Sequence, residues 1–183
     1  MTGPRDLVNR IAAAVGWTGS VSPELDWDVV EGRLGTRLPA DYKQFMERFP
    51  SGMFRNSIRI FNPSKDAANM ARFTAEFERI LEWVRIVRNE FADFASYPPF
   101  PEPKGVIPFA GIAAGGSLFW VPWTADPDKW HVVYQSGHSP DDWTRTRRSM
   151  TDVMLEFVTS RSTRNILGWD MSERDRSFEP FDL

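Results

Sequence analysis

Few residues in this chain have the types and spacing that metal or cofactor chemistry requires. The two histidines, His131 and His138, could bind a metal ion together with a carboxylate such as Asp141 or Asp142. Their spacing matches no known ligand pattern, and an isolated histidine in a strand usually packs or forms a hydrogen bond. Cysteine is absent, which excludes thiolate ligands, thiol nucleophiles and disulfides. We therefore expect no metal site and no cofactor.

The carboxylates likewise form no convincing catalytic pair. Asp126 and Asp128 flank Pro127 in a turn, where aspartate is common because its side chain bonds the nearby backbone. A buried or capping role explains Glu31. The chain contains neither a Gly-x-Ser-x-Gly nucleophile elbow nor a Gly-x-x-x-x-Gly-Lys-[Ser/Thr] phosphate loop. The sequence predicts a protein that is not an enzyme, with an enzyme of unrecognised site as a remaining alternative.

Aromatic and arginine side chains in the second half of the chain are candidates for a protein interface. Tryptophan and arginine are the usual anchors of such interfaces. Trp123 lies beside the turn that holds Asp126 and Asp128, and Trp143 lies among arginines. Packing within the protein is the alternative role for each tryptophan. We predict partner-binding residues at Trp123, Asp126, Asp128, Trp143 and Arg145.

The elements that must position these residues begin with three helices. Residues 6–15 predict a short amphipathic helix, and the Ser-Pro-Glu run at 22–24 predicts that a second helix begins at about residue 23 or 24. Gly35 should end that helix, because a helix end favours a residue that tolerates φ > 0. Pro39 should be the first residue of a third helix. Its apolar stripe has helical spacing and comprises Tyr42, Phe45, Met46 and Phe49.

A long helix is predicted over residues 65–94, after a capping break at residues 62–64. Leu81, Trp83 and Ile86 widen its apolar face, which favours packing on a sheet. A coiled-coil dimer is the alternative, because other apolar residues recur at alternating steps of three and four. We expect a monomer rather than a homodimer. The recurring residues are Met70, Phe73, Phe77, Ile80, Val84, Val87, Phe91 and Phe94.

The second half of the chain predicts strands. After a first strand at residues 57–61, strands are expected at 106–110, 118–121 and 130–135, separated by turns at 114–117 and 124–128. The Leu-Phe-Trp-Val run is apolar throughout, which indicates a central strand covered on both faces. Ser149 or Thr151 should cap a last helix. The predicted fold is α+β, a single domain with a mainly antiparallel sheet packed against several helices, one of them long.

The helical corner at residues 26–52 also resembles the opening motif of the SUKH superfamily. The resemblance extends to the strands and turns of residues 107–135 and to the last helix, so it covers roughly residues 22–160. Relatives often carry an acidic or amide residue in the turn where this chain has Ala-Gly-Gly-Ser, so a binding role of that group would not transfer. The motif residues are Trp27, Glu31, Leu34, Gly35, Leu38, Pro39, Asp41, Tyr42 and Phe45.

We expect three segments along the chain. Residues 1–21 form an N-terminal helix and link, residues 22–160 form the SUKH-like domain, and residues 161–183 form an acidic tail. Aromatic side chains interrupt the tail, which would let it dock on the domain rather than float freely. These side chains are Trp169, Phe178 and Phe181.

The SUKH superfamily contains fungal regulators of cell-wall synthesis and many bacterial immunity proteins that neutralise secreted toxins. The resemblance implies a non-enzymatic protein-binding domain, foremost an immunity protein that acts in the cytoplasm of a bacterium and binds a toxin domain. A regulatory or scaffold protein with an endogenous partner is the alternative. A net charge of −3 argues against nucleic-acid binding. No apolar run is long enough for a membrane span or a signal peptide, so we expect a soluble protein.

Overall fold

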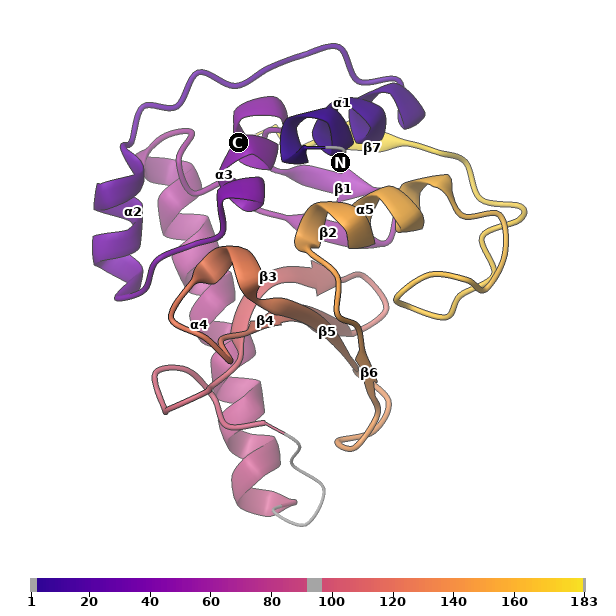
Figure 1. Ribbon diagram of the computed structural model, residues 1–183. Helices are drawn as coiled ribbons and strands as arrows, with labels where there is room; N and C mark the ends of the chain where they lie inside the picture. Colours follow the sequence, from indigo (N-terminus) through magenta and orange to yellow (C-terminus); the bar gives the residue numbers. More distant parts are fainter. Residues whose placement is uncertain (1–2, 92–96, 183) are drawn as a thin grey trace.

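The computed structural model describes residues 3–91 and 97–182. In this part of the chain, five α-helices and a short 3-10 helix surround a sheet (Figure 1). The helices are α1 (Pro4–Ala14), α2 (Trp27–Leu34), α3 (Ala40–Arg48), α4 (Ala67–Glu90) and α5 (Met150–Thr159), with η1 at Pro127–Lys129. The strands are β1 (Gly52–Phe54), β2 (Ile58–Ile60), β3 (Ile107–Ile112), β4 (Gly116–Val121), β5 (His131–Ser136), β6 (Trp143–Arg145) and β7 (Phe178–Pro180).

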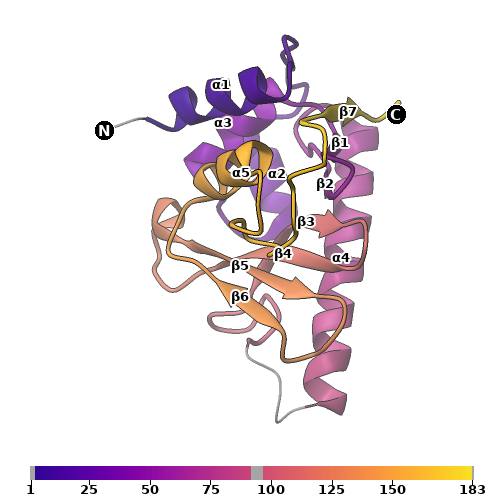
Figure 2. The ribbon, with the colours of Figure 1, turned by 90° about the vertical axis from the view of Figure 1, so that its right-hand side faces the viewer.

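The strands form one sheet in the order β6-β5-β4-β3-β2-β1-β7, and every pairing between them is antiparallel. Helix α4 lies along one face of the sheet, and α1, α3 and α5 cover the other (Figures 1 and 2). Strand β4 is covered on both faces, because Phe119 packs toward α4 and Trp120 packs toward α3. The predicted α+β fold, with an antiparallel sheet and one long helix, is confirmed.

The predicted start of the second helix is wrong. Helix α2 begins at Trp27 behind the N-cap Asp26, and the preceding residues are not helical. The backbone N–H groups of Glu24 and Leu25 bond the carbonyl of Ser64 at 3.0 and 3.1 Å. These bonds tie the segment to the chain before α4, and the helix starts only after it, at Trp27.

The corner between α2 and α3 matches the prediction more closely. Gly35 adopts the left-handed conformation at φ 73°, where a side chain would be strained. Pro39 is the N-cap of α3 rather than its first helical residue, a shift of one position. The predicted apolar stripe of α3 is fully buried in the core, at Tyr42, Phe45, Met46 and Phe49.

The long helix is also confirmed, with corrected ends and a narrower buried face. Its N-cap is Asp66, whose carboxylate accepts a hydrogen bond from Asn69 N at 2.8 Å, rather than the break at residues 62–64. The predicted last residue, Phe94, lies outside the described residues. Trp83 and Ile86 do not widen the buried face, because they are 44% and 37% exposed. The residues of the predicted seam that pack inside the protein are Met70, Phe73, Phe77, Ile80, Val84 and Val87.

The C-terminal segment docks on the domain as the last strand of the sheet. Strand β7 pairs with β1. The centroid of the Phe178 ring lies 4.6 Å from that of Phe54 and 5.1 Å from that of Phe49. The sheet also has a strand that the sequence did not predict. Strand β6 lies in the polar stretch of residues 136–149 and forms the opposite edge of the sheet.

Candidate protein-interaction surface

The predicted partner-binding residues lie in two groups on neighbouring elements. Trp123, Asp126 and Asp128 lie in the connection between β4 and β5, which contains η1. Trp143 and Arg145 lie on the edge strand β6, which pairs with β5. The two groups therefore lie on either side of β5.

The two aspartates hold the η1 turn in place. The Asp128 carboxylate accepts a hydrogen bond from Ala40 N at 2.6 Å and so caps α3, 88 residues away in sequence. The Asp126 carboxylate accepts a bond from Asp128 N at 3.2 Å and pairs with Lys129 Nζ at 3.4 Å. Both side chains have a structural use, which accounts for their place in a turn.

The two tryptophans differ in exposure. The Trp123 side chain is 51% exposed, and its ring centroid stacks 5.0 Å from that of His131. Its indole N–H donates to Lys129 O at 2.7 Å, which fixes the ring on the surface. Trp143 is half-buried rather than exposed, because its ring packs on the rings of Phe119 and Tyr97. The distances between ring centroids are 5.6 and 4.9 Å. Trp123 is thus the more accessible of the two anchors.

A surface hollow of about 380 Å³ lies between the two groups and is called the His131 hollow here. The guanidinium of Arg145 lies 5.3 Å from the centroid of the Tyr97 ring, within the range of a cation–π contact. The stack of Trp123 on His131 places that tryptophan next to the hollow. The lining residues are Tyr97, Val121, His131, Val133, Arg145, Thr146 and Arg147.

A second hollow of about 360 Å³, the Trp83 hollow, was not predicted from the sequence. Helix α4 supplies its aromatic wall, and the turns after β3 and β5 supply glycine backbone. A helical-wheel view could have placed Trp83 at the surface, since it lies between Glu82 and Arg85. The lining residues are Arg59, Arg79, Ile80, Trp83, Ile112, Ala113, Gly115, Gly116, Ser117 and Gly137.

A smaller cavity shares a lining residue with each of the two hollows. Trp83 and Tyr97 both line it, and each of them also lines one of the larger hollows. The three spaces therefore neighbour one another, on the side of the sheet that α4 covers. We call this surface the α4–β6 face, and define it by Arg59, Arg79, Trp83, Tyr97, Trp123, His131, Trp143, Arg145 and Arg147.

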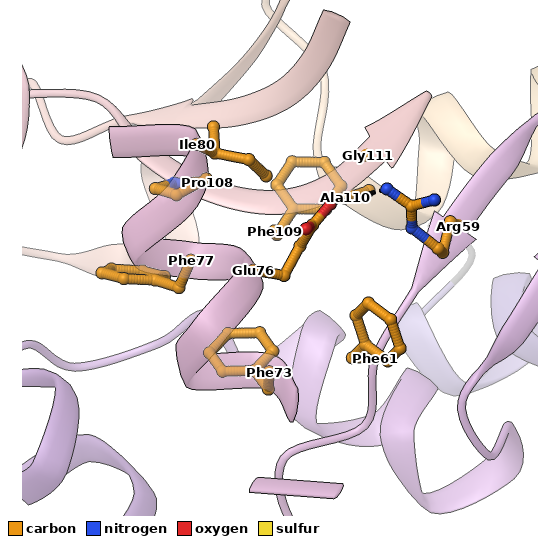
Figure 3. A pocket seen from close by; sticks show the side chains of 10 residues that line it. All are labelled: Arg59, Phe61, Phe73, Glu76, Phe77, Ile80, Pro108, Phe109, Ala110 and Gly111. Carbon is orange, nitrogen blue, oxygen red and sulfur yellow. Dashed lines mark hydrogen bonds and ion pairs between the residues drawn. The ribbon is translucent and has the colours of Figure 1, made fainter. Parts of the chain in front are cut away.

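An arginine–glutamate–arginine cluster lies at one end of this face. The Glu76 carboxylate of α4 accepts a bond from Arg59 of β2 at 2.8 Å, and two bonds from Arg79 at 2.7 and 2.8 Å. Figure 3 shows Glu76 and Arg59 meeting beside Gly111, at the edge of a cavity of only about 10 Å³. A Cβ on Gly111 would lie 2.8 Å from the Glu76 carboxylate, so glycine makes room for the pair.

Hydrogen bonds from the arginines determine the charge state of this cluster. The bond from Arg79 is the largest effect on Glu76 and lowers the pKa of its carboxyl group, against the opposing effect of burial. Glu76 in turn raises the pKa of Arg79. The cluster therefore holds two cations and one anion at neutral pH.

The acidic residues of the helical corner have structural partners. Glu31 accepts a bond from Leu38 N at 2.7 Å and pairs with Lys43 Nζ at 2.5 Å, which agrees with its expected capping role. Asp41 is buried and accepts bonds from both Thr151 N and Thr151 Oγ1 at 3.0 Å. Burial is the largest effect on Asp41 and raises the pKa of its carboxyl group.

Residues 3–91 and 97–182 contain no group of three or more His, Cys, Asp or Glu side chains that could hold a metal ion. The two histidines have separate environments. His131 stacks on Trp123, and His138 lies exposed in the loop after β5. Among the same residues, no helix combines the length and the apolar character that a membrane span requires.

The chain was compared with known proteins. Neither the curated proteins nor the solved structures gave a match. The family model SUKH_6, described as SMI1-KNR4 cell-wall, matches residues 24–151. The match starts in front of α2, ends at the first turn of α5, and includes the α2–α3 corner and strands β1 to β6. This stretch is well over half of the chain, which therefore belongs to the SUKH superfamily.

Proposed function

We propose that this protein is a non-enzymatic immunity protein that neutralises a bacterial toxin by binding it directly. The observation that carries the proposal is the α4–β6 face, which presents aromatic and arginine side chains around neighbouring hollows. Trp83 and Trp123 are its exposed anchors, at 44% and 51% exposure. Tryptophan and arginine are enriched among the residues that dominate binding energy at protein interfaces.

The organisation of the acidic side chains supports binding rather than catalysis. Glu31, Asp41 and Asp128 each accept a backbone N–H at a helix start or corner. Glu76 is occupied by two arginines. A general base needs a carboxylate that can reach a substrate proton, and these four carboxylates are already engaged within the fold.

The shape of the face also supports a protein partner. Its two hollows lie at the surface, one against α4 and the turns after β3 and β5, the other against β4, β5 and β6. A small-molecule site would normally enclose most of its ligand in one deep pocket. Shallow hollows separated by aromatic side chains are better suited to the side chains of another protein. Membership of the superfamily, which includes toxin-binding immunity proteins, supports a toxin domain as the proposed partner and the bacterial cytoplasm as the proposed place of action.

A co-expression experiment tests the proposal. The product of the neighbouring gene is expressed as the candidate toxin in bacterial host cells, with and without this protein, and survival is measured. We expect protection, and a complex that stays intact in size-exclusion chromatography. The paired variant Trp83→Ala/Trp123→Ala should lose both, whereas the exposed residue pair Arg5→Ala/Glu47→Ala, on α1 and α3, should retain both.

Two outcomes would count against the proposal. Survival without complex formation would point to an enzymatic or indirect mechanism. A stable complex with housekeeping proteins of the source cell, and no protection from the toxin, would favour a regulatory or scaffold protein instead.

A further inference from the structure

We propose that the Trp83 hollow receives a carboxylate side chain of the protein partner, so that the partner docks through an acidic segment. The inference rests on the proposed protein-binding function and specifies the chemistry of the partner. It is carried by three observations: the charge of the arginine–glutamate–arginine cluster, the open glycine backbone beside it, and the distribution of charge over the whole α4–β6 face.

The cluster has a surplus of hydrogen-bond donors. Glu76 receives three bonds, two of which come from Arg79 through Nε and one Nη. A guanidinium group carries five N–H donors, so the second Nη of Arg79 can bind another acceptor. The Arg79 side chain is 60% exposed and lines the hollow together with Arg59. Among the described residues, Glu76 is the only carboxylate within ion-pair distance of either arginine.

The glycine backbone on the other side of the hollow lets a partner chain come close. Gly115 and Gly116 have φ values of 100° and 91°, and a Cβ on Gly116 would collide with Gln135 O at 2.3 Å. Gly137 packs against this turn, with 2.9 Å between its ideal Cβ and Gly115 C. These clashes lie within the fold, so the close approach of the two turns requires glycine. As a result, backbone rather than side chains lines the hollow at Gly115, Gly116 and Gly137.

The charge distribution over the face points to an acidic partner. The two larger hollows are lined by four arginines, and in the described part of the chain no Asp or Glu lines either of them. The chain as a whole has a net charge of −3, so this face is positive on an otherwise acidic protein. Complementary charge guides encounter and selects between partners. Carboxylate groups are the anions that a protein surface supplies, and Arg binds them in a planar, bidentate geometry.

A titration of the protein alone tests the inference without the toxin. The probe is the peptide acetyl-Gly-Glu-Leu-Glu-Gly-amide, and its uncharged match is the same peptide with Gln in place of Glu. ¹⁵N-labelled protein is titrated with each peptide and followed by NMR. We expect the Glu peptide to shift the amide signals of Gly115, Gly116 and Gly137 and the indole signal of Trp83. The Gln peptide should leave these signals in place.

Two variants of α4 make the test specific. Arg79→Gln should weaken binding of the Glu peptide by about tenfold, since it removes a charged hydrogen-bond donor. Arg85→Gln is the matched control, because the Arg85 guanidinium bonds Glu82 at 3.2 Å and does not line the hollow. Its affinity should be unchanged. Both variants should retain the amide spectrum of the folded protein away from the substituted position.

The inference is overturned if both peptides shift the same signals equally, if the Glu peptide shifts only the His131 hollow, or if inorganic phosphate binds at the glycine turn and the Glu peptide does not. These results would leave the proposed immunity function intact, because that function is measured by protection of cells. Conversely, a specific shift by the Glu peptide without any protection would support an acidic partner of another kind.

Discussion

The side chain of Asp41 in the first turn of α3 binds the first turn of α5 through Thr151, 110 residues away. One carboxylate oxygen accepts both the backbone N–H and the hydroxyl of Thr151, each at 3.0 Å. The positive end of α5 and two donors favour the charged carboxylate. Burial opposes it and is the larger effect, so the pKa of Asp41 is raised.

This relationship predicts how stability depends on pH. A carboxyl group with a raised pKa binds more protons in the folded than in the unfolded state. Its contribution to stability is therefore complete below the ordinary carboxyl pKa of about 3.9, and is lost as the pH rises through the folded pKa. The unfolding free energy of the wild type relative to Asp41→Asn should fall as the pH is raised from about 3 to 7. Urea denaturation at several pH values measures it.

A second aspartate provides the control for this experiment. The backbone N–H of Ser172 lowers the pKa of the exposed Asp170. A group with a lowered pKa stabilises the protein above its unfolded pKa, and this contribution is lost as the pH falls through the folded pKa. Asp170→Asn should therefore give the opposite slope. If the unfolding free energy relative to each variant changes in the same direction with pH, burial does not explain the behaviour of Asp41.

Arg55 should be the residue on which docking of the C-terminal segment most depends. It is buried in the turn between β1 and β2, and its guanidinium donates to carbonyls at the end of α5 and in the following segment. Arg55→Met should lower the unfolding free energy by at least about 3 kcal/mol, because several buried carbonyls lose their donor at once. The acceptors are the carbonyls of Phe157, Val158, Ser160, Met171, Arg174 and Asp175.

Hydrogen exchange would show where the Arg55 variant loosens. We expect faster exchange in β7 and at the end of α5, and less change in β4 and β5. Arg161→Met is the matched control, since Arg161 is exposed in the same C-terminal segment. Equal effects of the two substitutions would argue against the role of Arg55.

Glu31 should stabilise the α2–α3 corner mainly as a hydrogen-bond acceptor. Glu31→Ala leaves Leu38 N without its partner and should cost about 1 to 2 kcal/mol of unfolding free energy. Glu31→Gln keeps an acceptor and loses only the partly exposed ion pair with Lys43, so it should cost less than about 1 kcal/mol. Thermal and urea denaturation compare them, with the exposed Glu47→Ala on α3 as control. Equal losses for Gln and Ala would show that the charge, rather than the acceptor, stabilises the corner.

The hydroxyl group of Tyr42 should not stabilise the protein. It is buried beside Trp120, with ring centroids 5.0 Å apart, and no described residue bonds it. An unsatisfied buried hydroxyl is unfavourable, so Tyr42→Phe should raise the unfolding free energy by about 0.5 to 1 kcal/mol. A clear loss of stability in urea denaturation would indicate that the hydroxyl has a partner such as a buried water.

Replacing the half-buried Trp143 should cost more stability than replacing the half-exposed Trp123. Trp143→Ala removes a half-buried ring from contact with Phe119 and Tyr97 and should cost about 2 to 3 kcal/mol. Trp123→Ala removes a ring that is half-exposed and should cost less than about 1 kcal/mol. Guanidinium denaturation measures both. Equal losses would mean that Trp123 is a structural residue as well.

Local sequence patterns were sufficient for most of the elements. The stripe of α3, the left-handed Gly35 and the apolar strand β4 follow from spacing and residue type, because neighbours along the chain determine them. The same signals misplaced the start of α2, where Glu24 N and Leu25 N bond the distant Ser64. They also overlooked β6, a short edge strand that lies in a polar stretch and pairs only with β5.

The α4–β6 face shows what the sequence could not provide. Trp123 and Arg145 could be selected as candidates because tryptophan and arginine are common at interfaces, but their position on either side of one hollow depends on the pairing of β5 with β6. The sequence placed Trp83 on the apolar face of α4. In the structure the sheet covers another side of this helix, and Trp83 is exposed.

The sequence by itself determined the family, the order of the five helices, the central strands, and most of the apolar stripes that face the core. The tertiary structure decided which polar groups are used inside the fold and which remain at the surface. Asp41 meets Thr151, and Arg59 meets Glu76 beside Gly111, only after the sheet has formed. Contacts between residues far apart in sequence leave no periodic pattern, so the partners of a buried charge become visible only in three dimensions.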